Sequence, residues 1–222
     1  MRERELRTSP LGSIGVGVMY LNSGRFGELD NTGAQTGATF IPQDLAVMAA
    51  WGGSVTRNLD LGLGVKYIAS RIHAAAATGA LDAGGRWRWK LLGRPAVFSF
   101  SVHHVGGNLR YNNSEETLPT TVSGGGALKL TRDWSLAAEL LAPRDGRIYG
   151  VVGTEFRWRF DGDSAATLRA GYNGLASSRE LGGFTALTAG GGYQAKRYGV
   201  DYAWTPFGRL GDIHRFTLSF SF

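Results

Sequence analysis

The sequence contains no cysteine, few prolines and no long apolar segment. The absence of cysteine excludes disulfide bonds and thiolate metal sites. No apolar run approaches the ~18 residues that a membrane-spanning helix needs, so that class of membrane protein is excluded. Residues 1–10 carry charge but have neither the apolar core nor the small-residue cleavage site of a secretory signal, so we expect no signal peptide in this chain.

The net charge of +6 raises the question of nucleic-acid binding. The basic residues are scattered singly through the chain, and acidic residues fall on the same predicted strand faces. A nucleic-acid-binding surface needs basic residues gathered into a patch or stripe. Charges of both signs on one face favour ion pairs instead. We therefore predict no nucleic-acid partner.

The strongest pattern that is present is an alternation of apolar and polar residues, and it is clearest at the C-terminus. A period of two residues predicts a β-strand with one apolar and one polar face. An apolar strand that ends on an aromatic residue is typical of outer-membrane barrels, whose last strand closes the sheet and faces lipid. The apolar side chains of this strand are the predicted signal for the outer-membrane assembly machinery: Phe216, Leu218, Phe220 and Phe222.

The same alternation predicts about twelve strands. They cover residues 12–21, 44–54, 58–70, 79–90, 95–105, 120–131, 134–142, 147–160, 165–173, 184–194, 198–205 and 213–222. Short turns alternate with longer loops along the chain, and the longer ones are expected at 22–43, 71–78, 106–119, 174–183 and 206–212. Short turns on one side of a membrane and longer loops on the other are the outer-membrane barrel pattern.

The tryptophans support the same interpretation, because all six fall on the apolar strand faces. Five are predicted near the periplasmic strand ends and one near the outer ends: Trp51, Trp87, Trp89, Trp134, Trp158 and Trp204. Amphipathic rings at the depth of the lipid headgroups form such girdles. A soluble β-sandwich would also alternate, but it has less reason to align its tryptophans at one level. We predict an all-β, transmembrane antiparallel β-barrel, with residues 1–222 forming a single domain.

Charged residues on the strands fall on the polar faces and are predicted to line the lumen. They are Asp60, Lys66, Asp82, Arg86, Arg88, Glu139, Glu155, Arg157, Arg159, Arg169, Asp201 and Arg215. On the lipid side, an arginine or lysine at mid-depth would cost ~2–4 kcal/mol. Inside, these groups either form a structural ion-pair network that fills the lumen or line a path for an anionic or amphipathic solute.

Catalytic and metal-binding patterns are weak. Ser99, Ser101 and His103 share the predicted inward face of one strand, which is part of what a serine hydrolase needs, but this spacing is weak evidence because serine is a common lumen residue. His103 and His104 are adjacent, so we expect them on opposite faces, unable to chelate one ion. The glycines lie inside predicted strands rather than in a strand-to-helix turn, which argues against a phosphate-binding loop. We predict no enzyme activity, no metal and no cofactor.

Three segments carry a resemblance to a known family. The segments GSIGVGVMYLNSGRF and FIPQDLAVMAAWGGSVTRNLDLGLGVKYIASRI, and then DYAWTPFGRLGDIHRFTLSFSF at the C-terminus, resemble strands of the PorV/PorQ-type outer-membrane proteins in the same order. These proteins form a FadL-like group of barrels. The closing hairpin is the more specific part of the match, whereas the earlier strands show the alternation of any barrel. Relative to that family, the N-terminal plug and the first two strands are expected to be missing here.

The resemblance implies a bacterial outer-membrane location and one of two functions. The first is transport or binding of hydrophobic or amphipathic compounds through the lumen. The alternative is an accessory role in type IX secretion, in which the longer loops 22–43 and 106–119 would bind a secreted protein. The implied partners are the lipid bilayer, the outer-membrane assembly machinery and either a hydrophobic ligand or a secreted protein.

Overall fold

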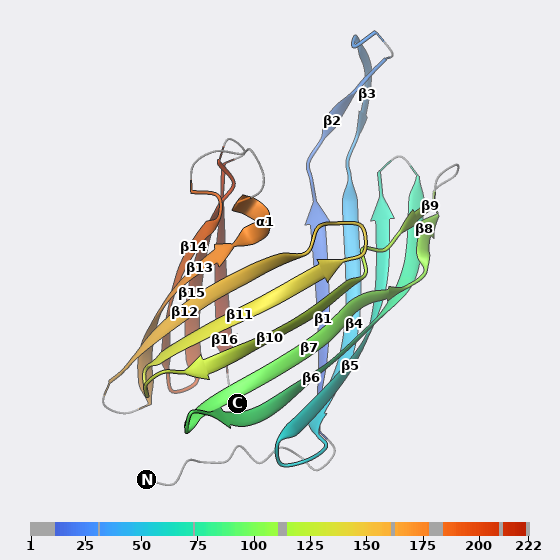
Figure 1. The fold of residues 1–222 in the computed structure, drawn as a ribbon. Helices are drawn as coiled ribbons and strands as arrows, with labels where there is room; N and C mark the ends of the chain where they lie inside the picture. Colours follow the sequence, from blue (N-terminus) through green and yellow to red (C-terminus); the bar gives the residue numbers. More distant parts are fainter. Residues whose placement is uncertain are drawn as a thin grey trace. The chain divides into compact units, whose positions relative to one another are not determined.

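The computed structural model describes residues 12–30, 32–72, 74–110, 115–160, 163–177, 184–208 and 211–220. Twelve strands form one antiparallel sheet, in which each strand hydrogen-bonds to the next (Figure 1). In order along the sheet they are β1 (Ser13–Asn22), β4 (Gln43–Ser54), β5 (Leu59–Arg71), β6 (Ala75–Leu91), β7 (Arg94–Gly106), β10 (Thr121–Lys129), β11 (Trp134–Pro143), β12 (Tyr149–Arg159), β13 (Ser164–Asn173), β14 (Leu187–Ala195), β15 (Tyr198–Pro206) and β16 (Asp212–Phe220). The twelve predicted strands are confirmed, most of them within three residues at each end.

The chain divides into two compact units. Residues 1–85 and 101–121 make up the first unit, and residues 86–100 and 122–222 make up the second. In the first unit, β4 pairs without interruption with β1 on one side and β5 on the other. In the second, the register from β11 to β16 also runs without a shift. An unbroken register keeps alternate side chains on one face along several neighbouring strands.

Two of the predicted longer loops contain hairpins of their own. Strands β2 (Phe26–Leu29) and β3 (Gln35–Phe40) pair within loop 22–43, and Figure 1 shows this hairpin extending beyond the ends of β1 and β4. The rings of Phe26 and Phe40 stack with centroids 5.8 Å apart. At the turn, Asp30 Oδ1 accepts hydrogen bonds from the backbone N–H groups of Thr32 and Ala34 at 2.8 and 2.9 Å. A stacked aromatic pair and a side-chain-capped turn thus order a segment that alternation alone assigned to a loop.

The second hairpin pairs β8 (Asn108–Arg110) with β9 (Glu115–Thr117) within loop 106–119. Glu115 Oε1 accepts hydrogen bonds from Asn108 Nδ2 and Arg110 Nε, both at 2.9 Å. These bonds, with that from Asn108 the larger influence, lower the pKa of Glu115 below its ordinary value of 4.5. The carboxylate therefore holds the two strands together most strongly when it is ionised.

The predicted loop 71–78 is wrong, because β6 already begins at Ala75. Its first residues are an alanine-rich stretch that lacks apolar–polar contrast, so the alternation could not reveal a strand there. Ala76 and Ala80 nevertheless lie on one face, and both are buried. At the other end of β6, the turn to β7 has positive φ at both central residues, Leu92 and Gly93. This is the requirement of a two-residue hairpin turn whose twist matches the strands.

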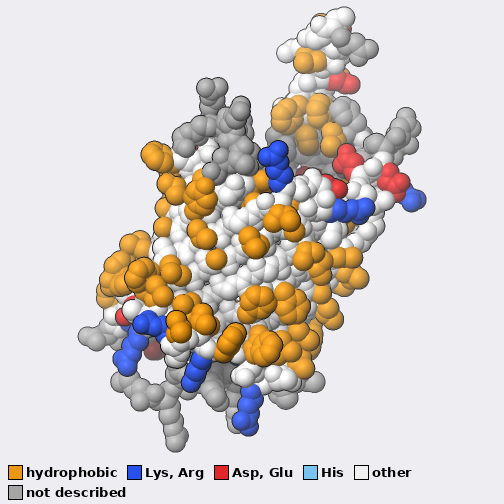
Figure 2. All heavy atoms as spheres, viewed as in Figure 1, with side chains coloured by type: hydrophobic (Ala, Val, Ile, Leu, Met, Phe, Trp, Pro, Cys, Tyr) orange, Lys and Arg blue, Asp and Glu red, His pale blue; other side chains and the backbone are white. Residues whose placement is uncertain are grey.

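The chain has almost no apolar core and a large exposed apolar surface. The buried apolar residues of the described ranges are three alanines and one leucine: Ala76, Ala80, Leu118 and Ala165. Large side chains such as Ile14, Leu63 and Phe216 are exposed, and Figure 2 shows hydrophobic side chains spread widely over the visible face. Soluble proteins rarely expose contiguous apolar surface on this scale. The apolar strand faces are therefore suited to lipid rather than water.

Among the residues that the structure describes, the one α-helix is α1 (Gly174–Ser177), a single turn that follows β13. Within the described ranges, no helix is long and apolar enough to cross a membrane.

Candidate functional site

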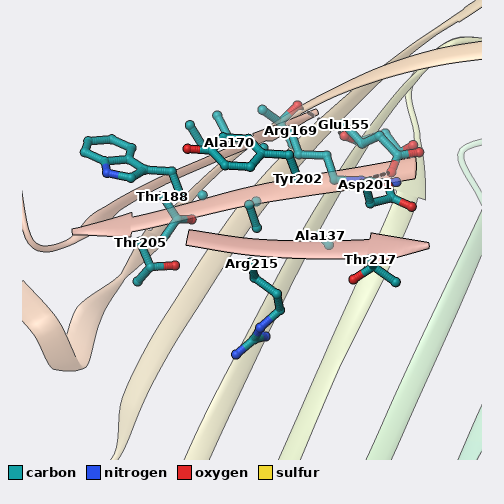
Figure 3. A pocket seen from close by; sticks show the side chains of 18 of the residues that line it. Ala137, Glu155, Arg169, Ala170, Thr188, Asp201, Tyr202, Thr205, Arg215 and Thr217 are labelled. Carbon is teal, nitrogen blue, oxygen red and sulfur yellow. Dashed lines mark hydrogen bonds and ion pairs between the residues drawn. The ribbon is translucent and has the colours of Figure 1, made fainter. Parts of the chain in front are cut away.

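The second unit contains an open hollow of about 780 Å³ on the polar face of strands β11 to β16 (Figure 3). The neighbouring strands place small residues at the positions that point into it, among them Ala137, Gly153, Gly190 and Ala203. Because these positions carry at most a methyl group, their side chains do not fill the hollow in front of the sheet. The threonines at 188, 205 and 217 add hydroxyl groups to this lining.

Arg169 lies at one end of the hollow between two carboxylates. Its Nε is 2.9 Å from Glu155 Oε2, and its Nη1 is 2.6 Å from Asp201 Oδ1. The three residues come from β12, β13 and β15, and Figure 3 shows them converging. Gly192 on β14, between β13 and β15, leaves room for this arrangement, because a β-carbon there would collide with the Asp201 carboxylate. Two carboxylates compensate one guanidinium, so the group keeps one net negative charge.

The other predicted lining residues of the second unit do not join the Arg169 group. Arg157 Nη2 donates to Gln194 Oε1 at 3.1 Å, and Arg159 pairs with Asp133 in the adjacent turn. Arg215 borders the hollow and points away from the Arg169 group in Figure 3. Three further predicted lining residues lie on strands of this unit: Arg86 and Arg88 on β6 and Glu139 on β11. Their exposure to a lumen stays a prediction.

The first unit holds a separate polar cluster around Asp82 on β6. Lys66 Nζ lies 2.5 Å from Asp82 Oδ2, and the backbone N–H of His104 donates to Asp82 Oδ1 at 2.9 Å. His103 Nδ1 lies 3.4 Å from Asp82 Oδ2, while its Nε2 is 2.9 Å from Ser101 Oγ. Asp60, the remaining predicted lining residue, accepts a hydrogen bond from Ser54 Oγ at 2.6 Å.

The prediction that His103 and His104 lie on opposite faces is wrong. The ring of His103 contacts Asp82, and His104 Nε2 lies 3.4 Å from Lys66 Nζ in the same cluster. The cause is the backbone of His104, whose φ of 57° is left-handed and interrupts the alternation of the strand. No sequence signal marks this position, since the residue is not glycine. Even so, the described residues contain no group of three or more acidic or histidine side chains arranged for a metal ion.

The predicted interface and assembly residues are largely exposed. The exposed tryptophans are Trp51, Trp87, Trp89, Trp134 and Trp158, whereas Trp204 is half-buried. Of the predicted assembly signal, Phe216, Leu218 and Phe220 are exposed, and Phe222 lies outside the described residues. The depth of the tryptophans in a membrane and the assembly role of the last strand stay predictions.

Comparison with protein-family models and with curated protein sequences gives no match. Comparison with solved structures does. The toluene transporter TodX of Pseudomonas putida is similar with a TM-score of 0.56 at 11% identity, over 86% of this chain and 72% of that one. A deltaS2S3 mutant of TodX, described as a monoaromatic hydrocarbon channel, gives a TM-score of 0.58 at 14% identity, over 94% of this chain and 79% of that one.

At these identities the likeness concerns the fold. It agrees with the twelve-stranded antiparallel sheet, the exposed apolar faces and the near absence of an apolar core. The chain therefore has the fold of a transmembrane antiparallel β-barrel similar to that of TodX.

Proposed function

We propose that this protein is an outer-membrane channel that passes or binds hydrophobic and amphipathic compounds, a function that needs no catalysis. The observation that supports it best is the hollow in the second unit. It lies on the polar side of strands whose opposite side is apolar, and small residues in its lining, such as Ala137, Gly153 and Gly190, help to leave it open. A purely structural barrel interior would be expected to fill that space with side chains.

The similarity to a toluene transporter and a monoaromatic hydrocarbon channel narrows the substrate class toward small apolar molecules. The walls of the hollow fit such molecules, because alanine, glycine and threonine methyl groups offer apolar contact while the Arg169 group is confined to one end. Ligand pockets commonly combine an apolar lining with a few placed polar groups that orient the ligand. The lipid bilayer and the assembly machinery are the partners that this function requires.

A matched pair of variants on β15 tests the proposal. Ala203→Trp places a large ring into the hollow, whereas Val200→Trp places the same ring on the opposite, exposed face of the same strand. Uptake of toluene by proteoliposomes is measured for both variants and the parent protein. We expect Ala203→Trp to slow uptake and Val200→Trp to leave it unchanged. Equal uptake by all three proteins would show that this hollow is not the path.

The accessory role in type IX secretion is the second candidate, and the two hairpins favour it. Loops 22–43 and 106–119 hold ordered ribbons, β2–β3 and β8–β9, that could present a binding surface. Deleting residues 26–40 discriminates the functions. A channel would keep toluene uptake after the deletion, while an accessory protein would lose binding of its secreted partner.

A further inference from the structure

We infer that the cluster in the first unit is a hydrolytic site for acyl esters, with Ser101 as nucleophile, His103 as general base and Asp82 as the residue that positions His103. This activity goes beyond passage of a solute and uses residues that are not in the hollow. The sequence alone offered Ser101 and His103 on one strand face, two residues apart. The structure adds the missing acid from the neighbouring strand β6.

The atoms follow the order that acyl transfer by serine requires. Ser101 Oγ is 2.9 Å from His103 Nε2, within reach for proton transfer. The other ring nitrogen of His103, Nδ1, faces the Asp82 carboxylate at 3.4 Å. This contact favours the tautomer with the proton on Nδ1 and the lone pair on Nε2 directed at the serine. A separation of 3.4 Å is long for a hydrogen bond, but catalytic contacts are often loose before a substrate binds.

The surroundings hold the acid firmly in place. Asp82 Oδ1 accepts a backbone hydrogen bond from His104 at 2.9 Å, and Lys66 Nζ contacts Oδ2 at 2.5 Å. His104, whose φ of 57° is left-handed, donates its N–H to Asp82 while His103 beside it reaches Ser101. Left-handed φ in a non-glycine residue is uncommon and concentrates at functional sites. The Lys66 ammonium compensates the charge of the Asp82 carboxylate, so the acid stays ionised beside His103.

The reaction needs only the ester and water. Ser101 Oγ attacks the carbonyl carbon while His103 Nε2 takes the hydroxyl proton. The ester C–O bond breaks, and the alcohol leaves with that proton. Water then attacks the acyl-serine, giving one proton to His103 and its hydroxyl to the acyl carbon. The carboxylic acid is released, and the proton returns from His103 to Ser101 Oγ. An ester with an apolar acyl chain suits a site on the inner wall of a barrel set in lipid.

The test uses the full chain folded in detergent micelles and an alkyl fluorophosphonate, which phosphonylates activated serines. Ser99 is the matched control, because it lies two residues before Ser101 on the same strand and by parity on the same face. We expect labelling of the parent protein and of Ser99→Ala, at least about 100-fold less labelling of Ser101→Ala and His103→Ala, and a mass adduct on Ser101. Hydrolysis of p-nitrophenyl butyrate should fall in parallel.

Asp82→Asn tests the positioning role. If Asp82 orients His103, the pH dependence of labelling changes its shape in this variant; a merely structural carboxylate would lower labelling equally at every pH. Unfolded protein is recognised because it lacks the heat-dependent shift in gel migration that folded barrels show. Where Asp82→Asn fails to fold, the comparison of Ser101→Ala with the parent protein decides the inference, because that substitution removes only one oxygen atom. Absence of labelling above the Ser101→Ala level in folded parent protein overturns the inference and leaves the cluster as a structural polar network.

Discussion

The assignment of the strand faces is best tested at two consecutive residues of β16. Leu218 is 67% exposed and pairs with Val200, which is also exposed, so both belong to the face assigned to lipid. Thr217 pairs with Asp201 and borders the hollow, so it belongs to the opposite face. The perturbation is the same in both places: Leu218→Arg and Thr217→Arg introduce one guanidinium each, one residue apart.

The expected costs differ because the surroundings differ. An arginine on the lipid face of a barrel strand costs ~2–4 kcal/mol at mid-depth, which is a factor of ~30 to 700 in the folded-to-unfolded ratio. An arginine at position 217 faces the Asp201 carboxylate across the ladder and can pair with it. We therefore expect Leu218→Arg to lower the folding yield sharply and Thr217→Arg to fold nearly as well as the parent.

The assay is folding from urea into lipid vesicles, with the folded fraction read from gel migration of unheated samples. Leu63→Arg on β5 repeats the measurement in the first unit. Leu63 is likewise exposed, and the next position along the strand, Gly64, belongs to the opposite face. Equal yields for Leu218→Arg and Thr217→Arg would refute the inside–outside assignment on which the lumen, the hollow and the lipid-facing surface all depend.

Three further predictions concern single residues. Arg169→Met leaves two carboxylates uncompensated, and since the ion pairs are partly exposed we expect a loss of about 1 kcal/mol in guanidinium unfolding, with Arg215→Met as the control. The lowered pKa of Glu115 means that its contribution to the β8–β9 hairpin is present above pH 4.5 and is lost as the pH falls through the folded-state value; amide exchange in the hairpin should show this, and Glu115→Gln should abolish it. Removing Phe222 should lower the barrel yield in cells, and an unchanged yield would make the terminal aromatic incidental.

The strands could be predicted because the side chains of a half-buried strand alternate between two faces, so apolar residues recur at every second position. In β5, Leu63, Val65 and Tyr67 are exposed while the intervening residues are half-buried, which is the alternation written in the sequence. The start of β6 escaped detection because four consecutive alanines carry no such contrast. The β2–β3 hairpin left a signal that could have been used: the stretch Asp-Asn-Thr-Gly that begins at Asp30 is a turn sequence, with Phe26 before it and Phe40 after it.

The candidate sites were harder to predict because they depend on which residues meet across strands. Sequence parity put Glu155, Arg169 and Asp201 on one face, but only the register shows that they converge on one guanidinium. That register is set by turn lengths and by the packing of many residues, which a single sequence states only indirectly. The same holds for Asp82 and Ser101, which lie nineteen residues apart in the chain and are linked through His103.

Parity therefore succeeds or fails for an identifiable reason. From β12 to β16 every ladder runs without a shift, so counting residues by twos assigns each side chain to its face correctly relative to its neighbours. At His104 one left-handed residue within β7 interrupts the alternation, so the ring of His103 contacts the Asp82 carboxylate and the ring of His104 contacts Lys66, the partner of that carboxylate. Irregular backbone of this kind persists only where surrounding contacts hold it. In this chain those contacts are the hydrogen bonds of Asp82 and Thr120 to the backbone of His104, so the same residues that defeat the sequence pattern also define the cluster.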